Sequence, residues 1–229
     1  MTQRHELRWG GFAGLAFLLL AILAALLPGV PPRVTDSTTT ITSFVTDGRT
    51  QLLFSALLCA TAAGLVIWFT AAFAEAIRER DERSDVHMAL LAGSVLVGGA
   101  IFTYGAMTAV LAYGAQTVST GTAVALFQGV MVLGAMLGFA AALPLAAAGI
   151  GILRTHLMPD WLGYVGLVAA AVSVLGGFGI FFDSGIYAPG GELMTYVPLI
   201  AGGIFVACAS VFMVREHLPE ATPMTLPQT

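Results

Sequence analysis

The chain has 229 residues, of which 58% are hydrophobic and only 10% are charged, and its formal net charge is −4. Because a soluble domain carries about 25% charged residues, this composition excludes an ordinary soluble protein and predicts one that uses lipid as its solvent. The nine basic residues are all arginines and are dispersed along the chain, which excludes the clustered basic face of a nucleic-acid-binding protein.

Six apolar stretches are long enough to cross a bilayer, whose core of about 30 Å needs about 20 helical residues. We therefore predict an all-α bundle of six transmembrane helices in a single domain, residues 1–218, followed by a flexible tail, residues 219–229. The first stretch could instead be a signal peptide with Arg4 and Arg8 in its charged region, but no small-x-small cleavage site follows it. The predicted spans are 9–27, 52–74, 88–113, 122–152, 162–182 and 193–214.

The arginines predict the orientation of these spans. Seven of them fall at the N-terminus, in the connections after the second and fourth spans, and in the C-terminal tail, whereas only Arg33 and Arg49 fall on the other side. Cytoplasmic loops carry the excess of Lys and Arg, so we expect both termini in the cytoplasm.

The connection from Pro28 to Thr50 is the longest on the outer side. Asp36 and Ser37 could cap a short helix there, and Ile41, Phe44 and Val45 would share one of its faces. We expect a short amphipathic helical turn that lies on the outer surface.

Small residues recur at four-residue spacing in two spans, as Gly10-x-x-x-Gly14 and Gly134-x-x-x-Gly138. Such patterns let membrane helices approach one another closely. We interpret them as packing within one bundle, and a homo-oligomer interface is the alternative.

Polar residues gather in the outer half of the predicted bundle. A polar side chain in lipid is costly and normally faces the bundle interior, so these residues could line an outward-opening pocket. The alternative is hydrogen bonding between helices that stabilises the bundle. The residues are Ser55, Thr103, Tyr104, Thr108, Gln128, Ser173, Asp183 and Tyr196, and all but Ser173 form the candidate ligand-binding set.

Histidines lie near the cytoplasmic rim, with His87 at the start of the third span, His156 after the fourth and His217 after the sixth. Three such ligands and one open position could hold Zn²⁺ and activate water, as in a membrane-embedded hydrolase. No pair has ligand spacing such as His-x-x-x-His, and polar residues belong at this interface, so we interpret them as interfacial.

No further sequence feature indicates a cofactor or an enzyme. No span has a histidine at mid-depth for haem, and the chain has no lysine for a retinal Schiff base. Walker A, Gly-x-Ser-x-Gly, His-Glu-x-x-His and Cys-x-x-Cys motifs are missing from the sequence.

The stretch from Ile152 to Gly166 resembles a signature, Arg-x-x-x-x-Pro-x-Trp-Leu-Gly-x-x-Gly, of small six-helix bacterial membrane proteins classed as a domain of unknown function. These proteins are abundant in actinobacteria. The family usually has a basic or small residue where this chain has Asp160, and it implies an inner-membrane location but no activity. The matching residues are Arg154, Pro159, Trp161, Leu162, Gly163 and Gly166.

Taken together, these patterns favour a non-enzymatic membrane protein that binds or passes a small molecule or lipid through an outward-facing polar pocket. Membrane lipid and a small-molecule ligand are the expected partners, and nucleic acid is not. One alternative is the metal-dependent hydrolase at the cytoplasmic histidines. The other is a structural or partner-binding membrane subunit without catalytic activity.

Overall fold

The computed structural model describes residues 2–114, 117–182, 185–189 and 191–215, without the side chains of residues 2–6 and 192–195. Every regular element in these ranges is a helix, which confirms the predicted all-α fold. The elements are α1 (Thr2–Leu26), α2 (Thr38–Asp47), α3 (Arg49–Arg78), α4 (Val86–Gly114), α5 (Thr120–Thr155), α6 (Asp160–Gly177), the 3₁₀ turn η1 (Phe178–Phe181) and α7 (Glu192–Arg215).

Six of the helices, all except the short α2, are long and apolar enough to cross a membrane. They contain the six predicted spans almost entirely, and most of them extend a few residues beyond each predicted end. Length and composition therefore identify a multi-pass membrane protein. The predicted tail, residues 219–229, lies outside the described residues.

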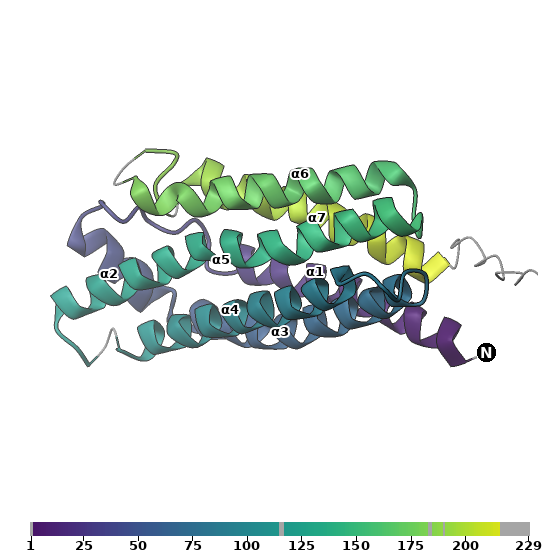
Figure 1. Ribbon diagram of the computed structural model, residues 1–229. Helices are drawn as coiled ribbons and strands as arrows, with labels where there is room; N and C mark the ends of the chain where they lie inside the picture. Colours follow the sequence, from purple (N-terminus) through teal and green to yellow (C-terminus); the bar gives the residue numbers. More distant parts are fainter. Residues whose placement is uncertain (1, 115–116, 183–184, 190, 216–229) are drawn as a thin grey trace, which may run out of the picture.

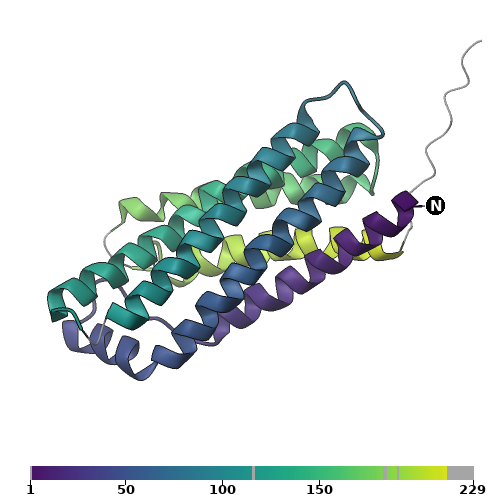
Figure 2. The ribbon, with the colours of Figure 1, turned by 90° about the horizontal axis from the view of Figure 1, so that it is seen from below.

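The six long helices form a closed ring in chain order. Each packs against the next one along the chain, and α7 returns to pack against α1 (Figures 1 and 2). α1 begins and α7 ends at the same end of the bundle, where the α3–α4 and α5–α6 connections also lie. α2 lies at the opposite end, so the bundle has a terminal end and an α2 end.

Glycines allow neighbouring helices in this ring to approach closely. A Cβ atom added to Gly138 on α5 would lie 2.4 Å from the carbonyl oxygen of Ser173 on α6. One added to Gly14 on α1 would lie 2.6 Å from Cδ2 of Phe69 on α3, and one added to Gly10 would also meet α3, at Ala72. Both predicted small-residue patterns thus pack within the bundle, as expected.

α2 is the amphipathic helix predicted for the longest connection. Ser37 caps it by accepting a hydrogen bond at Oγ from the Thr40 backbone N–H at 3.2 Å, which satisfies one of the free donors at the helix start. Ile41 and Val45 are each only 1% exposed, because this face packs on residues of α3, α4 and α5. α2 therefore covers part of this end of the bundle.

Candidate functional site

A small cavity of about 70 Å³ lies beneath α2. Its wall is built from the end of α1 and the linker that follows, from Phe44 of α2, and from α3, α4 and α5. Such a volume holds a few water molecules and is smaller than the roughly 300 Å³ at which pockets for drug-sized ligands begin.

Three of the predicted pocket residues meet at this cavity. Ser55 comes from α3, and Tyr104 and Thr108 lie one turn apart on the same face of α4. The Ser55 hydroxyl donates to the Ala24 carbonyl at 2.8 Å, and the Thr108 hydroxyl donates to the Tyr104 carbonyl at 2.9 Å. Since each hydroxyl has one hydrogen and two lone pairs, Ser55 and Thr108 can offer a ligand only acceptor sites.

The rest of the inner cavity wall is apolar, with Leu52, Leu111, Phe127 and Val130 all nearly fully buried. The Tyr104 ring occupies the space beside Gly134, where an added Cβ would lie 3.3 Å from Cε2 of the ring. A ligand in this cavity would thus meet an apolar surface with a few hydroxyl oxygens.

A second, open depression of about 780 Å³ lies beside the cavity and is lined by the α1–α2 linker, α2 and the start of α3. The two spaces share four lining residues, Pro28, Gly29, Pro31 and Phe44. These four residues lie between the cavity and the depression.

The other predicted pocket residues do not line the cavity. Thr103 is exposed and donates its hydroxyl to the Gly99 carbonyl at 2.8 Å, and Tyr196 is also exposed. Gln128 donates from Nε2 to the Val34 carbonyl at 3.2 Å, so it holds the α1–α2 linker to α5. Asp183 lies outside the described residues.

Sequence reasoning missed the linker residues and Phe44, which form a large part of the site. The run Pro28-Gly-Val-Pro-Pro32 was a usable signal, because proline fixes the backbone angle φ and a linker so restricted folds back in few ways. The path of this linker over the cavity could not be predicted in this way, because it depends on tertiary contacts such as the hydrogen bond from Gln128 to the Val34 carbonyl.

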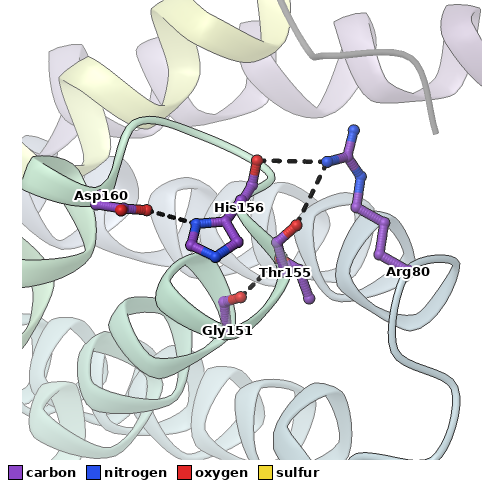
Figure 3. Close-up of polar contacts among 5 residues, drawn as sticks. All are labelled: Arg80, Gly151, Thr155, His156 and Asp160. Atoms are coloured by element: carbon purple, nitrogen blue, oxygen red, sulfur yellow. Dashed lines mark hydrogen bonds and ion pairs between the residues drawn. The ribbon is translucent and has the colours of Figure 1, made fainter. Parts of the chain in front are cut away.

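The histidines proposed for a metal site are at the terminal end of the bundle, away from this cavity. His156 ends α5 in the left-handed conformation, with φ 48°, and its Nδ1 lies 2.8 Å from Oδ1 of Asp160 (Figure 3). His87 lies at the start of α4, and His217 is outside the described residues. Within the described part of the chain, no three His, Cys, Asp or Glu side chains are grouped so that they could hold a metal ion.

Arg80 joins the two connections at this end. Its guanidinium donates to the Thr155 carbonyl at 3.5 Å and the His156 carbonyl at 3.4 Å, where α5 ends and its dipole is negative (Figure 3). Burial lowers the pKa of Arg80, but the side chain stays charged at neutral pH because the ordinary pKa of arginine lies far above neutrality. Arg80 thus links the α3–α4 connection to the end of α5.

No protein-family model, curated protein or solved structure matches the chain. The resemblance of the Ile152–Gly166 segment to a family signature stays a prediction. One residue of this segment, Gly163, has a packing role that explains it without reference to a family. A Cβ added there would lie 3.0 Å from the Gly149 carbonyl oxygen and force α5 and α6 apart.

Proposed function

We propose that this protein is a non-catalytic protein of the bacterial inner membrane that binds or passes a small molecule or lipid at its α2 end. The observation that carries this proposal is the cavity beneath α2, where three hydroxyl-bearing side chains meet between otherwise apolar walls. The cavity alone has room for only part of such a ligand, so the rest of a bound molecule would lie in the open depression beside it, which also supports access from the α2 end.

The arginine distribution supports an outward-facing α2 end. The connections and helix ends at the terminal end contain seven of the nine arginines, and the α2 end contains Arg33 and Arg49. Under the positive-inside rule the terminal end then faces the cytoplasm, and a ligand reaches the cavity from outside or from the outer leaflet.

The lining chemistry favours binding over catalysis. The residues that line the cavity include no histidine, carboxylate or thiol that could act as a general base or nucleophile. The Ser55 and Thr108 hydroxyls offer acceptor lone pairs, and the Tyr104 hydroxyl can donate or accept, so the preferred ligand has an apolar body and a polar group that forms hydrogen bonds.

Filling the cavity tests this proposal. Thr108→Leu adds bulk beneath α2, and Thr103→Leu is the matched control, because both threonines lie on α4 and both donate to the carbonyl four residues earlier. We expect native mass spectrometry of the purified protein to show a retained small molecule or lipid that Thr108→Leu loses and Thr103→Leu keeps.

Two results would contradict the proposal. One is a wild-type protein that retains no molecule in any gentle detergent. The other is a retained molecule that both variants keep equally, since such a molecule would lie on the outer surface of the helices.

A further inference from the structure

The open depression at the α2 end is lined by charges of both signs. Arg33 lies on its linker side, and Asp36 and Asp47 lie before and at the end of α2. Thr40, Ser43 and Gln51 add hydroxyl and amide groups to the lining. A volume of about 780 Å³ falls within the range of about 300–1,000 Å³ that small-molecule sites occupy.

None of these three charged side chains forms an ion pair within the described residues. Asp36 accepts the backbone N–H of Arg33 at 2.8 Å and so holds the turn before α2. The depression thus presents one cation and two anions without ion pairs, and of the two carboxylates Asp36 already accepts a backbone hydrogen bond.

The hydroxyls of the depression favour a ligand that donates hydrogen bonds. Ser43 gives its hydrogen to the Thr40 carbonyl at 3.0 Å, so its remaining lone pairs can only accept. Together with Asp47, it can receive hydrogen bonds from a primary ammonium group, whereas a quaternary ammonium has no hydrogen to donate.

The position of the depression indicates a lipid as the source of these groups. Its lining includes Leu27 and Val30, whose side chains are 40% and 80% exposed where the chain leaves transmembrane helix α1. Apolar side chains so exposed at the end of a span lie at the depth where the acyl chains of a bilayer begin. A headgroup can therefore enter the depression while its acyl chains stay beside α1.

We propose that the depression binds the headgroup of phosphatidylethanolamine, with the phosphate at Arg33 and the primary ammonium at Asp47. This inference rests on the proposed function, because it names the ligand class of the same α2-end site. Arg33 would hold the phosphate through charge-assisted hydrogen bonds, and Asp47 with the Ser43 hydroxyl would accept those of the ammonium.

Titration of the full-length protein in detergent with short-chain lipids, followed by native mass spectrometry, tests the inference. We expect short-chain phosphatidylethanolamine to bind more tightly than phosphatidylglycerol, which lacks the ammonium. Arg33→Gln and Asp47→Asn should each weaken this binding about fivefold, the effect of a partly exposed charge pair. The matched controls are Arg83→Gln and Asp85→Asn, exposed charges in the connection before α4 at the terminal end, and they should leave binding unchanged.

The outcomes separate this inference from the proposed function. Binding that is lost in Thr108→Leu but does not depend on the headgroup or on Arg33 and Asp47 would overturn the inference and keep the proposed cavity. Headgroup-selective binding that Asp47→Asn weakens and Thr108→Leu leaves intact would support the inference and overturn the proposed role of the cavity. Equal competition by soluble phosphoethanolamine would show a free zwitterion site and overturn the assignment to lipid.

Discussion

Gly138 offers a direct test of how the bundle is held together. An alanine there would place its Cβ 2.4 Å from the Ser173 carbonyl oxygen and 3.0 Å from the Gly177 backbone nitrogen. Carbon–oxygen contacts normally stay beyond about 3.3 Å, so α6 must move away by about 1 Å. Both contacts are with backbone, which cannot turn aside as a flexible side chain could. We therefore expect Gly138→Ala to destabilise the protein by about 1–3 kcal/mol.

Gly129 on the same helix is the matched control. A Cβ added there has no atom within 4 Å, so Gly129→Ala should be neutral or stabilise the helix by about 0.5–1 kcal/mol. Thermal unfolding of both purified variants in one detergent would measure the two effects. The midpoint should fall for Gly138→Ala and stay or rise for Gly129→Ala. Equal shifts in both variants would refute close α5–α6 packing at Gly138.

Two further substitutions test the two ends of the bundle. His156 has a φ of 48°, which a β-branched residue adopts only at a cost, so His156→Val should lower the free energy of unfolding by about 1–2 kcal/mol. His156→Gly removes the same contact with Asp160, but glycine adopts that φ without strain, so it should lower the free energy of unfolding much less in the same thermal assay. Equal losses in the two variants would show that the contact with Asp160 matters more than the backbone conformation. At the other end, Ile41→Ala should leave a void costing about 2–4 kcal/mol and speed hydrogen exchange in α2. The exposed Thr46→Ala is its control, and equal exchange in the two variants would contradict the anchoring of α2 by Ile41.

Part of the candidate site could be predicted because local spacing decides it. Tyr104 and Thr108 share a helix face whatever surrounds the helix, and the structure places both at one cavity. Ser37 caps α2 because a hydroxyl near a helix start finds a free backbone N–H without tertiary contacts. The ligand role of Ser55, Tyr104 and Thr108 stays a prediction.

The faces of Thr103 and Tyr196 could not be predicted in the same way. In a soluble protein the apolar face of a helix marks the interior, but a membrane helix is apolar on all sides. Thr103 lies one residue before Tyr104, yet it is exposed, and its hydroxyl bonds to its own helix. Since a hydroxyl can satisfy itself in that way, its presence in a span does not show which side faces the bundle.

The sequence by itself determined that six helices are long and apolar enough to cross a membrane, because the length of an apolar stretch is compared directly with the thickness of the bilayer. Only the tertiary structure decided that these helices close into a ring in chain order and that the α1–α2 linker folds over a cavity. The physical reason is that lipid chains are as apolar as leucine, so hydropathy does not choose between neighbours. The neighbours of each helix are instead set by the fit of their surfaces, through backbone contacts such as that of Gly138 with Ser173. That fit is visible only when the helices are packed together.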